Sequence, residues 1–483
     1  DKIDIMKYAI YYCKLDCIVL MKGIEKFNND LEEVFKQTNT DMMSVHNYIS
    51  ISSIGYNYAF KYGCFDECFL LSGKPQNFIL RCVSGGRTMC ANNEKQYVEG
   101  RIQDFDAVSL YPSAMSIMEG VPKGIPKVIP SDITKEELLR YDQFFAEINI
   151  KSIKCKSDVP YKFGQLFSRN EQGSKLFNNN PIDHFYIDKI GFKDLMEFYD
   201  FEYEFVRGYY FNDGFNNTIN KFIEKLFNLR LKYKKQNNPL QSTIKLLLNS
   251  IYGKSILKAL PTETKCIPKE RVIKYIWKYY NYITEITENV SIDNVYVKRI
   301  KPIDHHFNLP QFGASVLSYS KHLMNQVMGT AEQNNINIYY TDCDSLHLNE
   351  SDLSVLAKIF KSKYNKELIG SKMTQYHCDF DSFEGSVGKV YSKKLIALGK
   401  KSYLDILVDE KGNEGYHIRM KGIPKQCILN KCKRLGITVE DLYERLYKGE
   451  EMTFNLLDGT NAFRKSKSYQ QINLPVFTRT IKF

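Results

Sequence analysis

Two short apolar runs separated by a polar turn stand out in the hydrophobic pattern of the chain. The runs on either side of Thr341 to Asp344 are rich in aliphatic and aromatic residues, which predicts two strands joined as a hairpin. The turn carries two aspartates, Asp342 and Asp344. Because neighbouring carboxylates repel each other, a divalent cation would stabilise them, and the pattern favours a Mg²⁺ site. The alternative is a solvated polar turn, where Asp is common.

A second carboxylate lies at the end of another predicted strand. Alternation of apolar and polar residues ends near Asp106, and the chain is expected to turn through Ser109 to Pro112 into a short helix around Ala114 to Met118. A carboxylate at a strand end can face a metal, and N–H groups of the following turn can bind phosphate oxygens. The alternative is an aspartate that only caps a helix.

Residues 216–235 have a helical period, with Ile219, Phe222, Ile223 and Leu226 on the inward face. The sequence Asn-Asn-Pro at 237–239 predicts a break. A second helix, predicted from near Gln241, would complete an antiparallel helical hairpin.

Three polar or aromatic side chains share one stripe of that second helix: Lys245, Asn249 and Tyr252, with Gly253 at its end. Together with Arg230 on the facing helix, this stripe suits a triphosphate and a stacked base. The alternative is an ordinary solvated face.

The remaining pattern predicts further elements. Residues 2–36 have a helical rhythm, and 80–115 are expected to form strand, Gly-Gly turn and strand. Residues 255–308 are basic and Tyr-rich and are interpreted as an irregular insertion. A capping box at Thr438 predicts a helix that ends at Gly449, within a small C-terminal lobe.

Composition narrows the class of protein. The 483 residues are 43% hydrophobic and 25% charged, which is typical of a globular chain of two to four domains. The net charge of +11 suits a polyanionic partner, although excess Lys is also typical of an AT-rich genome. The 12 cysteines include no C-x2-C pair, which argues against zinc and disulfide frameworks and favours a reducing, cytosol-like compartment. No membrane span or signal peptide is visible, and a chain beginning at Asp1 is expected to be a fragment or a processed product.

Taken together, the three candidate segments resemble a known family. Asp106-x2-Ser-Leu-Tyr-Pro-Ser resembles motif A of family B DNA polymerases, Lys245-x3-Asn-Ser-x-Tyr-Gly resembles motif B, and Tyr340-x-Asp-Cys-Asp-Ser resembles motif C. The three occur in the family's order and spacing. Three weak motifs in order are far more specific than any one of them.

Further matches extend the resemblance. Lys401-Ser402-Tyr403 resembles the family's Lys-x-Tyr motif, and Gly85-Gly86 resembles its Tyr-x-Gly-Gly motif, although Val83 stands where Tyr is usual. That departure puts a template contact there in doubt. Tyr12-x3-Asp16 is similar to the Exo III motif of the proofreading domain, whose partner motifs are absent here. Tyr12 and Asp16 are therefore interpreted as inert residues of an exonuclease remnant.

The resemblance implies a mixed α/β right-hand polymerase with an α+β palm, helical-hairpin fingers and a small thumb. Two extra blocks resemble terminal-protein regions of protein-primed polymerases from phages, linear plasmids and mobile elements. The implied domains are an exonuclease remnant (1–45), a linker and first part of the palm (46–117), terminal-protein region 1 (118–211), fingers (212–254), terminal-protein region 2 (255–308), the second part of the palm (309–418) and the thumb (419–483).

The resemblance also implies roles for single residues. Asp106 and Asp344 would bridge two Mg²⁺ ions (or Mn²⁺), with the Val108 carbonyl and Asp342 as further ligands. Tyr111 would exclude a 2′-hydroxyl. Nucleotide would be bound by Ser109, Leu110, Tyr111, Arg230, Lys245, Asn249 and Tyr252. Primer or template DNA would be held by Gly85, Gly86, Ser250, Gly253, Thr341, Lys401 and Tyr403.

The expected partners are a DNA template-primer, dNTPs and a terminal protein that primes synthesis, with no membrane and with the chain as a monomer. A nucleic-acid-primed family B enzyme is the closest alternative. A reverse transcriptase usually has adjacent aspartates and lacks the motif B helix. A non-catalytic DNA-binding relative would have lost a carboxylate, whereas all three are present here.

Overall fold

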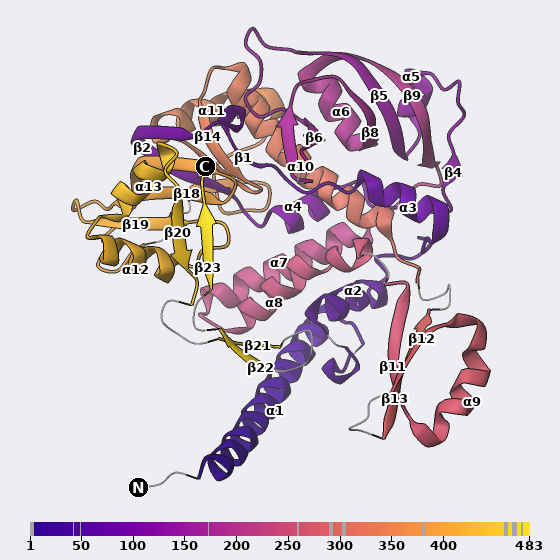
Figure 1. Ribbon diagram of the computed structural model, residues 1–483. Coiled ribbons are helices and arrows are strands. Elements are labelled where there is room, and N and C mark those ends of the chain that lie inside the picture. Colours follow the sequence, from indigo (N-terminus) through magenta and orange to yellow (C-terminus); the bar gives the residue numbers. More distant parts are fainter. Residues whose placement is uncertain are drawn as a thin grey trace.

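The computed structural model describes residues 4–41, 43–48, 50–171, 173–257, 260–288, 293–301, 306–378, 380, 382–457, 462–465, 471–474 and 477–483, with only the backbone described at 462–465 and 471–474. Figure 1 shows a central sheet, a pair of helices below it and smaller modules around them.

The central sheet is antiparallel and runs β1-β14-β15-β2-β17-β18-β19, with β16 also paired to β2. Its strands are β1 (Thr88–Cys90), β2 (Gln96–Ala107), β14 (Ile338–Asp342), β15 (Ser345–Asn349), β16 (Tyr376–Cys378), β17 (Tyr391–Gly399), β18 (Ser402–Val408) and β19 (Glu414–Arg419). Helices α10 (Pro310–Gln333) and α11 (Glu350–Tyr364) contribute to its core, where Phe105, Leu346 and Leu348 pack with Val327 and Leu356. Alternation along β15 thus fixes which side chains enter the core.

The predicted helical hairpin is confirmed. It comprises α7 (Thr218–Lys235) and α8 (Leu240–Ser250), and all four residues predicted to face inward are buried. They join a core with α2 (Ile51–Lys61) and α4 (Leu110–Ile117). This shared core fixes the hairpin beside the turn that follows β2.

The chain between α4 and α7 forms a separate module (Figure 1, upper right). Its sheet runs β4 (Lys127–Val128), β9 (Tyr199–Phe211), β5 (Gln143–Cys155) and β8 (Ile182–Asp188). Helix α5 (Lys135–Arg140) precedes β5, and α6 (Lys189–Phe198) packs on α10. Phe198 meets Gly329 of α10, where any Cβ would clash with the ring. A small hairpin, β6 (Leu166–Arg169) and β7 (Lys175–Asn178), and the short pair β3 (Val121–Pro122) and β10 (Phe215–Asn216) complete this part.

Residues 255–308 were expected to be irregular, and this expectation is wrong. A three-stranded sheet runs β11 (Thr262–Pro268), β13 (Asn294–Ile300) and β12 (Ile283–Glu288). Along the chain, α9 (Lys269–Tyr279) lies between β11 and β12. Alternation in β13 buries Val295 and Val297, a two-residue period that the surrounding charge and Tyr content masked.

Two other local expectations are corrected. The segment before Gly85 is helix α3 (Gly73–Cys82) instead of a strand, because Phe78, Ile79 and Cys82 recur at helical spacing and are buried. Helix α4 begins at Leu110, earlier than expected, because Pro112 fits the first turn of a helix, where no N–H partner is required.

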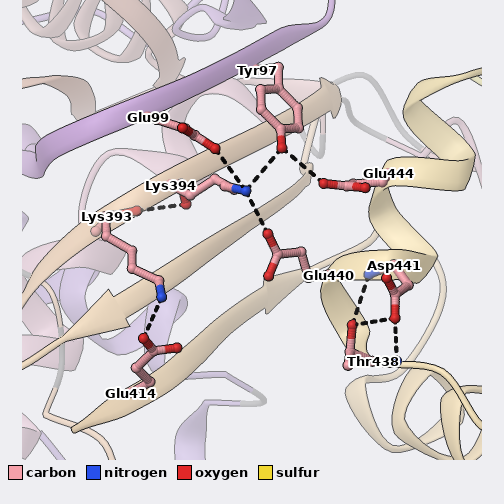
Figure 2. Close-up of polar contacts among 10 residues, drawn as sticks. Tyr97, Glu99, Lys393, Lys394, Glu414, Thr438, Glu440, Asp441 and Glu444 are labelled. Atoms are coloured by element: carbon pink, nitrogen blue, oxygen red, sulfur yellow. Dashed lines mark hydrogen bonds and ion pairs between the residues drawn. The ribbon is translucent and has the colours of Figure 1, made fainter. Parts of the chain in front are cut away.

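The C-terminal lobe contains α12 (Lys425–Leu435), α13 (Val439–Tyr447), the pair β20 (Met452–Asn455) and β23 (Thr478–Ile481), and the pair β21 (Ala462–Lys465) and β22 (Gln471–Leu474). The predicted Thr438 capping box opens α13. Lys394 of β17 joins the lobe to the sheet through Glu440 of α13 at 2.6 Å and Glu99 of β2 at 2.9 Å (Figure 2). These contacts raise the pKa of Lys394, first through Glu440 and then through Glu99.

Helix α1 (Ile5–Thr38) projects away from the body with the N-terminus at its far end (Figure 1). Its buried residues are Leu31, Val34, Phe35 and Thr38, all near its C-terminal end. No helix within the described residues combines the length and apolar character needed to cross a membrane.

Candidate active site

The carboxylate hairpin is formed by β14 and β15, as predicted. Asp342 ends the first strand, Cys343 adopts a left-handed conformation (φ 68°), and the Asp344 N–H donates to the carbonyl of Asp342 at 2.8 Å. The buried Thr341 hydroxyl donates to the carbonyl of Ser345 at 2.9 Å. These contacts make the tip a tight turn and place Thr341 inside it, away from solvent.

Strand register brings Asp106 to this tip. Asp106 pairs with Ser345 across β2 and β15, and the Ala107 N–H donates to the carbonyl of Asp344 at 2.8 Å. Both Asp106 and Asp344 act on the buried phenol of Tyr376, whose pKa is raised first by burial and then by these two negative charges. Asp106 and Asp344 therefore lie together, although 238 positions separate them in sequence.

The turn after β2 contains the predicted phosphate-binding residues. Ser109 adopts a left-handed conformation (φ 48°), and Leu110 and Tyr111 begin α4 directly after it. The Arg230 guanidinium of α7 donates to the Ser109 hydroxyl at 3.0 Å. Burial lowers the pKa of Arg230, and its Nε is buried without a hydrogen-bond partner in the described structure. A half-buried cation with an unused donor is suited to an anionic ligand.

Tyr111 and Tyr252 join the turn after β2 to the chain just beyond α8. Their rings stack with centroids 4.8 Å apart and planes inclined by 27°. Lys245 and Asn249 are exposed on α8, and neither makes a hydrogen bond or ion pair with another described residue. Since no described residue engages these two side chains, they are available to a ligand that enters beside the ring pair.

The last two residues of the motif B segment sit at the end of α8. The Ser250 hydroxyl donates back to the carbonyl of Leu246, one turn earlier in the helix. Gly253 begins a short 3₁₀ turn. No hydrogen bond between described residues joins either of them to the carboxylate tip, and the predicted DNA contacts of both stay predictions.

Asp342 has a different environment from the other two aspartates. It accepts from the Lys401 ammonium at 2.7 Å and from the Thr88 hydroxyl at 3.1 Å. Lys401 has a left-handed backbone (φ 56°), and its N–H donates to the phenol of Tyr340 at 2.9 Å. Asp342 is thus paired with a cation of the protein, and its secondary role as a metal ligand stays a prediction.

Tyr403 lies beneath the surface. It is 5% exposed and packs on Tyr340 with ring centroids 4.7 Å apart. The prediction that the Tyr403 side chain contacts the primer end directly does not agree with this burial. The ring instead supports Tyr340, whose phenol positions Lys401.

Gly85 and Gly86 pass next to the hairpin tip. A Cβ on Gly86 would lie 3.2 Å from the Cα of Cys343, whereas a Cβ on Gly85 would meet nothing within 4 Å. The Cys343 N–H donates to the carbonyl of Arg87 at 2.7 Å. The predicted Gly-Gly segment therefore supports the carboxylate tip from one side and is open on the other.

The carboxylate oxygens at the tip suit a divalent cation whose remaining ligands come from a bound substrate. Burial, followed by the charges of Asp342 and Asp104, raises the pKa of Asp344, so a nearby cation would relieve its unfavourable ionisation. Among the described residues, no group of three or more His, Cys, Asp and Glu side chains is arranged to hold a metal ion. Two carboxylates suit Mg²⁺ that is also bound by substrate phosphates, whereas the Val108 carbonyl, the predicted further ligand, accepts from the Ser113 hydroxyl at 2.7 Å.

Two predicted residues lie elsewhere. Tyr12 and Asp16 are exposed on the projecting part of α1, and among the described residues the ring of Tyr12 stacks on Tyr8 of the same helix. The structure does not bring either residue to the carboxylates.

Sequence reasoning missed the polar group behind the tip. His347 is fully buried between Asp405 (3.3 Å) and Asp104 (3.6 Å). Burial alone would lower its pKa, but Asp405 and Asp104 raise it to about 9. Strand alternation could have revealed part of this group, because Asp104 shares a face of β2 with Asp106.

Fold and site together define the class, a polymerase of the right-hand type. A family model described as "DNA polymerase type B, organellar and viral" matches residues 1–334, and the chain belongs to this family. The predictions of the family and of a mixed α/β right-hand fold are confirmed. The matched residues include Asp106 and α8 and end before the hairpin of Asp342 and Asp344.

The chain is also similar to named proteins. A DNA polymerase from Kluyveromyces lactis is 23% identical over 92% of this chain and 41% of its own length, and a probable DNA polymerase from Neurospora intermedia is 24% identical over 89% and 41%. The chain thus spans about two fifths of the length of these relatives. A structure of Phi29 DNA polymerase matches with a TM-score of 0.61 at 16% identity, covering 94% of this chain and 70% of that one. At this identity the match shows the fold alone.

Proposed function

We propose that this chain is the polymerising part of a template-directed DNA polymerase that adds dNTPs to a primer. The pairing of Asp106 with Ser345 carries the proposal, because it joins two distant carboxylates at one strand edge. The stacked rings of Tyr111 and Tyr252 lie beside a half-buried arginine on the neighbouring helix. Nucleotide addition requires both a binding site for metal-bound phosphates and a surface on which the base and sugar can pack.

Two Mg²⁺ ions, or Mn²⁺, would activate the primer hydroxyl and neutralise the phosphates when bound. Asp106 and Asp344 would hold them, with the carbonyl of Val108 as a further ligand. Arg230 and Lys245 would bind the triphosphate from the helical hairpin, and the N–H groups at the start of α4 would bind it from below. Lys401 would act on the primer side, because it lies at Asp342 on β14, the strand of the hairpin that is not paired with β2.

Tyr111 would form the floor under the sugar. Its ring is fixed by the stack on Tyr252, and such a pair contributes roughly 0.5–1.5 kcal/mol beyond simple burial. A rigid ring at that place leaves little room for a 2′-hydroxyl, so DNA synthesis is favoured over RNA synthesis. Asn249 would complete the base-pair pocket from the exposed face of α8.

Substitution of Asp344 tests the proposal. Asp344→Asn keeps the size of the side chain and removes its charge, so metal-dependent dNTP addition should fall by at least about a hundredfold. Binding of primer-template should be unchanged. Asp132→Asn, at an exposed carboxylate far from the tip, is the matched control and should behave as the parent. Addition near the parent rate by Asp344→Asn would refute the assignment.

We further propose that synthesis is primed by a protein, in the replication of a linear viral, plasmid or mobile-element genome. The modules between α4 and α7 and between α8 and α10 support this through their resemblance to terminal-protein regions. The test is incubation with a candidate terminal protein and labelled dNTP. A covalent nucleotide on a protein hydroxyl is expected, and extension of nucleic-acid primers alone would favour the alternative.

A further inference from the structure

Three cations gather beside the Gly-Gly segment, outside the residues discussed so far. Arg169 of β6 pairs directly with Lys175 of β7 across the small hairpin. The Lys175 ammonium donates to the Ser84 hydroxyl at 2.6 Å. From the central sheet, the Lys400 ammonium donates to the carbonyl of Lys175. The hairpin is therefore connected both to the segment before Gly85 and to the turn between β17 and β18.

These cations lack acidic partners within the part of the chain that the structure describes. None of the three forms an ion pair with a carboxylate of any described residue. Like charges directly opposite each other on paired strands are destabilising. Burial, and then the charges of Lys321, Arg169 and Lys400, lower the pKa of Lys175 to about 8. Such a concentration of positive charge is unfavourable unless an anion occupies the site.

The cluster is next to the carboxylate tip on two sides. Ser84, which accepts from Lys175, directly precedes Gly85, beside which space is open. Lys400 directly precedes Lys401, which contacts Asp342. A strand that ends at the carboxylates and passes over Gly85 would bring its backbone phosphates to this cluster.

We propose that Lys175, Arg169 and Lys400 form a phosphate clamp, which binds a backbone phosphodiester of the nucleic acid held at the carboxylate hairpin. The proposal rests on the proposed function and deepens it. It assigns to the β6–β7 hairpin of the inserted module a direct role in binding the strand. Ser84 positions Lys175 through its hydroxyl.

Salt dependence of binding tests the clamp. The logarithm of the binding constant falls linearly with the logarithm of the salt concentration, and each lost phosphate contact makes this negative slope shallower by about one. Primer-template affinity would be measured without metal for the parent chain, Lys175→Gln, Lys175→Arg and Lys127→Gln. Lys127 is an exposed lysine on β4 of the same module without an acidic partner among the described residues, and serves as the matched control. Thermal unfolding checks that each variant is folded.

Lys175→Gln should reduce the slope by about one and weaken binding, while Lys175→Arg retains both and Lys127→Gln leaves both unchanged. An unchanged slope for Lys175→Gln, with DNA still bound by the parent, overturns the clamp and leaves the polymerase proposal standing. If Lys175→Gln raises KM for dNTP without any change in DNA affinity, the cluster binds a triphosphate, and this result also overturns the clamp. No binding of primer-template by the parent overturns both proposals.

Discussion

Two adjacent glycines offer a sharp test of how the carboxylate tip is held. A methyl group at Gly86 would lie 3.2 Å from the Cα and 3.3 Å from the carbonyl oxygen of Cys343, whereas one at Gly85 would lie in open space. Ordinary carbon contacts lie at about 3.5–4.0 Å, so Gly86→Ala must displace the tip by roughly 0.4 Å. Neither glycine has a left-handed backbone, so alanine adds no backbone strain at either position.

A displacement of about 1 Å at a reacting group can cost about a hundredfold in rate, and 0.4 Å therefore corresponds to roughly sixfold. Single-turnover nucleotide addition at saturating primer-template and dNTP should fall by about that factor in Gly86→Ala. Gly85→Ala should retain the parent rate at saturation, and any change should appear in DNA affinity. Equal single-turnover rates for the two variants would refute the reasoning that Gly86 positions the tip.

Three further predictions concern sugar choice, stability and pH. Tyr111→Val should relax rejection of ribonucleotides by at least about tenfold in kcat/KM ratios, and unchanged rejection would remove Tyr111 from that role. Lys394→Met should lower the free energy of unfolding by about 2 kcal/mol in denaturant titrations. Lys393→Met, at a side chain that is 40% exposed against 16% for Lys394, should lower it by under about 0.5 kcal/mol, and equal losses would contradict the junction in Figure 2. The pKa of His347 is raised from 6.5 to about 9, so its stabilising effect is complete below pH 6.5 and lost as pH rises through 9. Thermal unfolding should show this loss in the parent and not in His347→Gln, and parallel profiles would argue against the ion pair with Asp405.

Local patterns predicted the elements of the site well. The hairpin, the strand ending at Asp106 and the stripe on α8 all follow from short-range periodicity and turn chemistry, which act within a few residues. The pairing of Asp106 with Ser345 could be anticipated only through the family resemblance, because register between distant strands depends on tertiary packing.

The parts that the sequence did not reveal depend on long-range contacts. Lys175 and Lys400 are unremarkable in sequence, and only the docking of the β6–β7 hairpin on the sheet brings them together. The burial of Tyr403 was hidden because a Lys-x-Tyr pair does not indicate which side of the sheet its ring occupies. Residues 255–308 were misjudged because tertiary packing overrides composition in short strands.

The ion pair between Lys401 and Asp342 has a consequence for charge stoichiometry at the tip. With Asp342 compensated by the lysine, Asp106 and Asp344 contribute two negative charges, which balance one divalent cation. A second divalent cation would leave a net positive site until a triphosphate brought its own negative charges. If two metal ions bind there as proposed, electroneutrality would favour one ion binding before the nucleotide and the other binding together with it.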